Sequence, residues 1–191
     1  MIINWNDVAL ESAMREITEI TDRPITTGDV AGITELNLEG YGIHSIEALR
    51  CFPRLHELNL ESNDIQDISP LGKLLELKKL FLGDNALSDI APLKTLKKLT
   101  HLSLNNNAIT EIDPLSELSA LELLDLEANH IRDIGVLSGL WNLEELYLAD
   151  NPIQDTTPLL DMAALCRLSL DEELQEEDIV DILEDNDVEL V

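Results

Sequence analysis

The chain has 191 residues, of which 45% are apolar and only 3% aromatic. This length allows one domain with a substantial core, and the core must be built mostly from aliphatic side chains. The net charge of −27, from 39 acidic and 12 basic residues, argues against nucleic acid or an anionic membrane as the main partner, because both would repel such a surface.

The beginning of the chain gives no sign of export or membrane insertion. Its first twenty residues, MIINWNDVALESAMREITEI, lack the basic start and unbroken apolar run of a signal peptide. No stretch of the sequence approaches the length of a transmembrane helix. We therefore expect a cytoplasmic protein, and secretion by a route without a cleavable signal stays open.

Residues 5–20 predict an amphipathic helix. Its apolar side chains recur near helical spacing: Val8, Leu10, Met14, Ile17 and Ile20. Asn4 or Asn6 is placed to cap its start, and the stretch TDRPITTGD ends it. We interpret residues 1–32 as a cap that covers the apolar edge of the repeats that follow.

From Ile33 onward the sequence repeats every 22 residues, in seven coils. Apolar residues recur at positions 1, 4, 6, 11, 14, 17 and 20 of each coil, and a fixed period of this length predicts a solenoid. The alternation L-x-L predicts a short strand, with Leu58 and Leu60 inward and Asn59 outward in the second coil. Stacked coils would join these strands into a parallel sheet, with crossovers on the far side. The coils begin at Ile33, Leu55, Leu77, Leu99, Leu121, Leu143 and Leu165.

Position 9 of the coil is asparagine in five coils. A buried turn needs partners for its backbone groups, and an amide side chain can both donate and accept hydrogen bonds. We expect a structural ladder rather than a catalytic group. Its members are Asn63, Asn85, Asn107, Asn129 and Asn151.

Position 16 is proline in four coils, which indicates the first turn of a short helix on the outer side. The residue before it is serine, aspartate or threonine in three of these coils, and such side chains can cap a helical turn. The outer side of each coil is therefore predicted to be a short helical or 3₁₀ turn. The prolines are Pro70, Pro92, Pro114 and Pro158.

The C-terminal segment, residues 171–191, is strongly acidic, with 11 Asp or Glu and no Lys or Arg. The sequence EEDIVDILEDNDVELV predicts an amphipathic helix on Ile179, Val180, Ile182 and Leu183, followed by a short strand through Val188 and Leu190. We interpret it as a solvated C-terminal cap, because it lacks the glycine and alternating spacing of an EF-hand loop.

The consensus L-x-x-L-x-L-x-x-N-x-I-x-x-I-x-x-L-x-x-L over residues 33–170 is the leucine-rich repeat pattern. Its 22-residue length and DISPL-type outer segments resemble the bacterial internalin-like class and the regulatory subunit of type-one protein phosphatase. The resemblance implies one α/β domain: a right-handed, curved leucine-rich repeat solenoid. A concave parallel sheet, convex 3₁₀ turns, an N-terminal helical cap and a C-terminal helix-strand cap belong to that fold.

The sequence carries no recognisable catalytic or metal-binding constellation. His44, His56, His101 and His130 fall at four different coil positions, outside any HExxH, zinc or triad-like arrangement. A glycine-rich phosphate loop and a GxSxG motif are also lacking. We therefore expect no catalysis, no metal and no cofactor.

In this architecture the residues between the inward leucines face the concave side and form the candidate partner-binding surface. Phe81 and Tyr147 lie on it three strands apart, about 14 Å at sheet spacing, and a few such anchors carry most of an interface's energy. The predicted contact residues are Lys79, Phe81, His101, Leu123, Asp125, Glu145, Tyr147 and Arg167. Positions 7 and 8 extend the face with Glu61, Asp84, Asn105, Asn106, Glu127 and Asp150.

The sequence thus predicts a non-catalytic module that binds a partner protein and is itself monomeric. One alternative is a regulator of a phosphatase-type enzyme. Another is a structural module that self-associates through a basic stripe, because all six lysines lie between Lys73 and Lys98; simple charge balance is the interpretation we favour for these. The six are Lys73, Lys78, Lys79, Lys94, Lys97 and Lys98.

Overall fold

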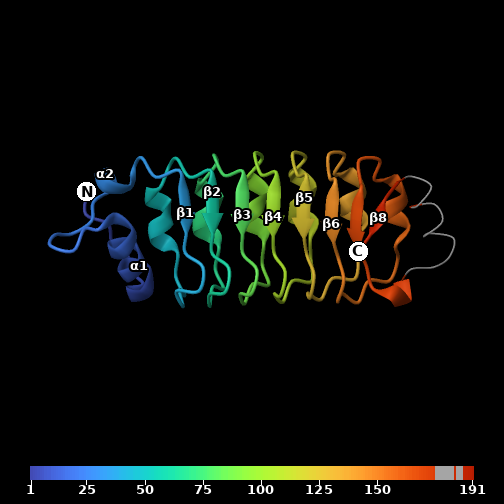
Figure 1. The fold of residues 1–191 in the computed structure, drawn as a ribbon, viewed down its shortest axis with the longest axis horizontal. Helices are drawn as coiled ribbons and strands as arrows, with labels where there is room; N and C mark the ends of the chain where they lie inside the picture. The colour runs from blue at the N-terminus through green and yellow to red at the C-terminus, as the bar shows by residue number, and fades with distance from the viewer. Residues whose placement is uncertain (175–182, 184–186) are drawn as a thin grey trace.

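The computed structural model describes residues 1–174, 183 and 187–191, and its coils stack side by side along one axis (Figure 1). Helices α1 (Val8–Thr18) and α2 (Thr27–Val30) lie at the N-terminal end. The strands follow one per coil: β1 (Glu35–Asn37), β2 (Glu57–Asn59), β3 (Lys79–Phe81), β4 (His101–Ser103), β5 (Leu123–Asp125), β6 (Glu145–Tyr147), β7 (Arg167–Ser169) and finally β8 (Glu189–Leu190).

All eight strands form one parallel sheet in sequence order. The register is 22 residues at every step between the first seven strands, as in the pairing of Leu80 with Leu58 on one side and Leu102 on the other. The predicted leucine-rich repeat solenoid is therefore confirmed, with one strand contributed by positions 3 to 5 of each coil.

The core is a continuous column of aliphatic side chains running the length of the stack. Leu58 and Leu60 are fully buried, as the alternation predicts, while Asn59 between them is half-buried and faces outward. The aromatic contribution to the core lies at the junction of the N-terminal cap and the first coil, where Trp5 packs against Phe52 with ring centroids 6.4 Å apart.

The position 9 asparagines connect each coil to the one before it. The Oδ1 atom of Asn129 accepts a hydrogen bond from the Ile109 N–H at 3.0 Å. Its Nδ2 donates to the Leu104 carbonyl of the preceding coil and to the Leu126 carbonyl of its own coil, both at 3.0 Å. The same set of bonds recurs in all five coils, so one side chain satisfies several backbone groups that the turn would otherwise leave unpaired. The five are Asn63, Asn85, Asn107, Asn129 and Asn151.

The residue just before each of these asparagines has a left-handed backbone. In coils 2 to 6 its φ lies between 51° and 58°, and only the first coil has glycine there. Asparagine and aspartate tolerate this region better than other residues, so Ser62, with φ 56°, and Ala128, with φ 53°, are the positions where the repeat backbone is least favoured.

The outer side of each of the first six coils is a five-residue 3₁₀ turn, as predicted, and proline occupies its first positions in four of them. The cap differs from the expectation. Ser69 lies inside its turn, and its N–H donates to Asp67 Oδ1 at 2.8 Å; Asp89, Asp133 and Asp155 accept the same bond from the residue two positions on. The tight 3₁₀ start leaves that N–H free, and an aspartate two residues earlier can reach it. The turns are Glu47–Cys51, Ser69–Lys73, Ala91–Thr95, Asp113–Glu117, Gly135–Gly139 and Thr157–Asp161.

The N-terminal helix α1 covers the first coil but begins later than expected. Its N-cap is Asp7, not an asparagine: Asp7 Oδ1 accepts from Leu10 N–H, and its Oδ2 accepts from His44 and Ser45 N–H of coil 1, all at 2.9 Å. One carboxylate thus caps the helix and ties it to the solenoid. The short helix α2, which the sequence interpretation missed, starts with a capping box between Thr26 and Asp29.

The buried face of α1 is narrower than the apolar pattern predicted. Leu10, Ala13 and Met14 are fully buried, whereas Val8 is 87% and Ile17 41% exposed. The residues at i, i+3 and i+4 share one face of a helix, and Val8 lies two residues before that set.

At the C-terminal end, β8 continues the sheet, and Arg167 pairs in register with Glu189. This confirms the predicted short strand. The predicted helix on Ile179, Val180 and Ile182 lies outside the described residues. Within the described part of the chain, none of the helices has the length and apolar character needed to cross a membrane.

Candidate protein-binding face

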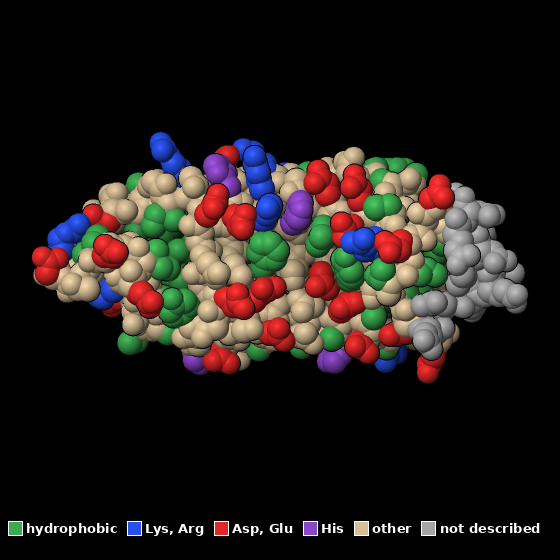
Figure 2. Space-filling model, viewed as in Figure 1, with side chains coloured by type: hydrophobic (Ala, Val, Ile, Leu, Met, Phe, Trp, Pro, Cys, Tyr) green, Lys and Arg blue, Asp and Glu red, His purple; other side chains and the backbone are tan. Residues whose placement is uncertain are grey.

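The outward side chains of strand positions 3 and 5 and of the following position 7 form one surface, which we call the sheet face. Figure 2 shows it: Lys, Arg and His side chains gather above an apolar one near the centre, and a row of acidic side chains lies beneath. The structure brings all eight predicted contact residues onto this face, each half-buried: Lys79, Phe81, His101, Leu123, Asp125, Glu145, Tyr147 and Arg167.

The charges of position 3 largely compensate one another along the row. Lys79 Nζ lies 3.6 Å from Glu57 Oε2 on the neighbouring strand. Arg167 lies between two acids, with its guanidinium 3.4 Å from Glu145 Oε2 and 3.0 Å from Glu189 Oε2. These ion pairs are partly exposed, so each contributes little to stability, but together they offset the negative charges of Glu57 and Glu145 in this row.

Three apolar side chains interrupt the polar surface. Phe81, Leu123 and Tyr147 lie on β3, β5 and β6 with their ring or chain partly open. The Tyr147 hydroxyl donates to Glu145 Oε2 at 2.8 Å, which holds the ring in place over the sheet. Burial and the Glu145 carboxylate both raise the pKa of Tyr147, so its hydroxyl stays a donor at physiological pH.

The carboxylates of positions 5 and 7 are close enough to affect one another. Burial raises the pKa of Asp125 to about 6; the hydrogen bond from Glu127 N–H opposes this rise, whereas the nearby Glu127 and Glu61 carboxylates reinforce it. Burial also raises the pKa of Glu61, with Glu39 and Asp84 adding to the effect. Ionised carboxylates near one another and partly desolvated repel, and the proton is then held more tightly.

Two serines lie next to this acidic row, each near a glutamate that belongs to a coil two steps earlier. Ser103 Oγ donates to Asn105 Oδ1 at 2.7 Å and lies 3.5 Å from Glu61 Oε1. Ser169 Oγ donates to Glu127 Oε1. Both serines are buried. Ser169 therefore holds Glu127 above the sheet, whereas the single Ser103 proton goes to Asn105.

The third coil has glycine at position 7, and the Asn105 side chain lies directly above it. A Cβ added to Gly83 would lie 2.2 Å from Asn105 Oδ1. The Asn105 amide therefore lies over Gly83, and a side chain at position 83 would require that amide to move.

The remaining lysines lie away from the sheet face and are partly paired. Lys97 Nζ is 2.6 Å from Glu117 Oε2, and Lys98 Nζ is 2.7 Å from Glu76 Oε2. These contacts join neighbouring coils, so they favour local charge balance over a free basic stripe.

One exposed aromatic escaped the sequence interpretation. Trp141, at position 21 of its coil, is 70% exposed and lies outside the strand positions. The sequence did indicate its exposure, because position 21 lies outside the recurring apolar positions of the repeat. However, a tryptophan next to a leucine is usually assigned to the core.

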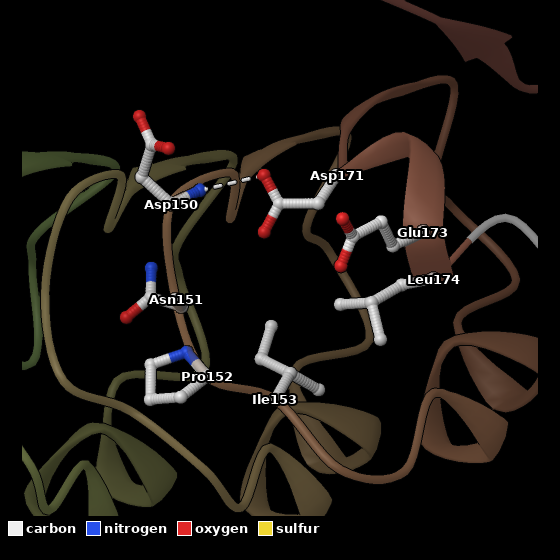
Figure 3. A pocket seen from close by; sticks show the side chains of 7 residues that line it. All are labelled: Asp150, Asn151, Pro152, Ile153, Asp171, Glu173 and Leu174. Atoms are coloured by element: carbon white, nitrogen blue, oxygen red, sulfur yellow. Dashed lines mark hydrogen bonds between the residues drawn. The ribbon is translucent and has the colours of Figure 1, made fainter.

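A hollow of about 500 Å³ opens where the asparagine column ends. The seventh coil has Glu173 at position 9, so the Ile153 N–H donates to the Asn151 carbonyl at 2.8 Å instead of to a following asparagine. In Figure 3 the carboxylates of Asp150 and Asp171 lie at the top of this hollow and Ile153 at the bottom, with the Asp150 N–H donating to Asp171 Oδ1 at 2.9 Å.

Metal chemistry has little to build on here. Over the described ranges, no group of three or more His, Cys, Asp or Glu side chains is placed to hold a metal ion. Cys51 and Cys166 are both free thiols. What the sheet face offers instead is a rigid platform of mixed apolar and charged groups.

Family comparisons match the repeats. The description "Leucine Rich repeat" matches residues 54–68, "Leucine Rich repeats (2 copies)" matches residues 75–117, and "Leucine rich repeat" matches residues 98–153. A comparison with curated proteins found no match to the chain.

Solved structures with the same architecture include two internalins of Listeria monocytogenes. The chain is 33% identical to internalin inlF, with a TM-score of 0.83 over 86% of this chain and 49% of that one. It is 27% identical to internalin C2, with a TM-score of 0.71 over 98% of this chain and 94% of that one. The chain thus spans about half the length of inlF. The functional domain of InlJ, at 22% identity and a TM-score of 0.76 over 87% of this chain and 36% of that one, shows a similar fold.

Proposed function

We propose that this chain, a leucine-rich repeat protein of the internalin-like type, binds a partner protein on its sheet face. The main observation behind the proposal is that three partly exposed apolar side chains lie on the same face of the sheet. They are Phe81, Leu123 and Tyr147. Fold alone does not fix function, so the argument rests on these side chains and their surroundings.

The sheet face has the layout of an interface. Its apolar side chains lie at the centre and are surrounded by charged and amide groups, and interfaces typically place a few apolar anchors inside a polar rim. The backbone beneath them is held by strand pairing and by the asparagine column, so little conformational entropy is lost when a partner binds.

The test is the double substitution Phe81→Ala with Tyr147→Ala, compared with the wild type in affinity capture from a native lysate. We expect one or more proteins to be retained by the wild type and lost by the double variant, with the midpoint of thermal unfolding nearly unchanged. Trp141→Ala is the matched control, because it removes an exposed aromatic elsewhere and should leave capture intact.

Two results would contradict the proposal. A fall of several degrees in the unfolding midpoint of the double variant would mean that the two rings pack rather than present a surface. Equal capture by wild type and double variant would place the interface elsewhere, with the Lys73–Lys98 region as the next surface to test.

Self-association through the lysines is a weaker candidate. The ion pairs of Lys97 and Lys98 with Glu117 and Glu76 use their charge within the chain. Salt-sensitive oligomers in size-exclusion chromatography would support self-association, and a monomer at low salt would contradict it.

A further inference from the structure

The rows of the sheet face differ in their charge balance. At position 3 the lysine and the arginine each have an acidic neighbour on an adjacent strand. Positions 5, 7 and 8 contain no Lys or Arg in any of the seven coils. They do contain carboxylates, among them Glu39, Glu61, Asp84, Asp125, Glu127, Asp150 and Asp171. In the described part of the chain, none of these seven takes part in an ion pair with Lys or Arg.

One apolar anchor, Tyr147, lies directly beside this uncompensated charge, and Phe81 lies two strands from it. Asp125 is in register with Tyr147 on the adjacent strand. Phe81 is in register with Ser103, which is in register with Asp125. Phe81 and Asp125 are therefore two strands apart, about 10 Å at sheet spacing. Glu127, two residues after Asp125, is held in place by the buried Ser169 hydroxyl.

A partner that covers the apolar anchors must therefore also cover carboxylates. A neutral partner would desolvate Asp125 and Glu127 without supplying a counter-charge, which is costly. An acidic partner would add repulsion. A basic partner removes the repulsion among these carboxylates and forms charge-assisted hydrogen bonds with them.

We propose that the partner presents a basic segment to the sheet face, and that an arginine of that segment binds the Asp125 and Glu127 carboxylates while stacking on the Tyr147 ring. Arginine fits better than lysine because its planar guanidinium can bind carboxylates through two hydrogen bonds and stack on an aromatic ring at the same time. This inference rests on the proposed function, since it names the chemistry of the partner at the same surface.

The test starts from a displayed library of random 12-residue peptides. The library is first depleted on the Phe81→Ala, Tyr147→Ala variant and then selected on the wild type. Because the two proteins have the same net charge, peptides that bind through overall charge alone are removed in the first step. We expect the retained peptides to be enriched in arginine.

A retained peptide is then synthesised, and its Kd is measured against two variants that each remove two negative charges. Asp125→Asn with Glu127→Gln changes the sheet face; Glu111→Gln with Asp161→Asn changes exposed side chains in the outer segments of two coils. We expect the first to weaken binding about tenfold or more and the second less than twofold. Thermal unfolding of both variants checks that they are folded.

The outcomes separate the two proposals. Retained peptides that are neutral or acidic, or equal weakening by both charge variants, would overturn the basic partner and leave a binding face in place. If no peptide depends on Phe81 and Tyr147, both proposals fail. A synthetic peptide of residues 73–98 is assayed in parallel; if it binds more tightly than the selected peptides, the occupant is a second copy of this chain and the inference is wrong.

Discussion

At the scale of single residues, the ionised Asp125 carboxylate on the sheet face lowers the stability of the fold. Its pKa in the folded protein is about 6, above that of an unfolded aspartate, so the folded state holds the proton more tightly. Stability at this site is therefore highest at low pH and falls as the pH rises from about 4 to about 6.

Replacing Asp125 with asparagine should remove that penalty. The amide oxygen can still accept the bond from Glu127 N–H. At pH 7 we expect a gain of up to about 1 kcal/mol in the free energy of unfolding, a figure kept low because the half-exposed carboxyl is screened by solvent. At pH 4 the gain should vanish, and chemical denaturation at the two pH values measures both.

Asp155→Asn is expected to change the free energy of unfolding in the opposite direction in the same assay. The hydroxyl and backbone N–H of Thr157 hold the pKa of Asp155 below its usual range, so this substitution should lower stability at pH 7. If both substitutions shifted stability in the same direction, the assigned protonation of Asp125 would be wrong.

Ala128 carries the backbone strain of the fifth coil. With φ 53° its Cβ is in a region that costs an L-residue about 1–2 kcal/mol, and glycine recovers most of this but adds entropy to the unfolded chain. We expect Ala128→Gly to stabilise by about 0.5–1 kcal/mol, raising the midpoint of thermal unfolding by about 1–4 °C. Ala108→Gly, at an exposed position without positive φ, should instead destabilise.

The sequence predicted the position of some site residues but not the properties of others. Phe81 and Tyr147 could be assigned to the outward row because strand parity is read directly from the leucines. The raised pKa of Asp125 could not be predicted, because it depends mainly on burial and in smaller part on the Glu127 and Glu61 carboxylates. The burial and the approach of Glu61 exist only in the stacked structure.

At the scale of elements, the junction between α1 and the first coil depends on Asp7. Burial raises the pKa of its carboxyl, but the N–H groups of Leu10, His44 and Ser45 outweigh this effect and lower it. Asp7→Ala removes both the N-cap and the link to coil 1, and we expect a loss of about 2 kcal/mol.

Hydrogen exchange gives the sharper readout for this junction. The amides of α1 should exchange faster in Asp7→Ala, while those of the central strands keep their protection. Glu16→Ala, an exposed position of the same helix, is the control and should leave exchange of α1 unchanged. Uniform exchange across all elements in Asp7→Ala would mean that the cap does not unfold separately.

The elements also show which local features the sequence patterns predict and which they do not. The strands followed from the alternation of buried leucines, and the 3₁₀ turns followed from the prolines that recur every 22 residues. The turn caps did not: Ser69 and Asp67 are both good capping residues, and only the geometry of the tight turn determines which one accepts the backbone bond.

At the scale of the whole molecule, the strands and the 3₁₀ turns of each coil pack against those of its neighbours, so the column of leucines must hold the stack together. Leu102, fully buried in the central coil, should cost about 2–5 kcal/mol when replaced by alanine. Leu123→Ala on the next strand, an outward position, should cost much less. Urea denaturation measures both, and equal losses would contradict the assignment of inward and outward sides.

Because the register between neighbouring strands is constant, side chains at the same repeat position are separated by a whole number of strand spacings. Excising residues 121–142 would bring Leu143 into the place of Leu121, and the Ile109 N–H would find the Asn151 amide where Asn129 had been. Phe81 and Tyr147 would then lie two strands apart instead of three, about 10 Å instead of about 14 Å. Duplicating a coil would lengthen the interval by the same step, so the reach of this surface can change only in fixed increments while each coil keeps its internal bonds.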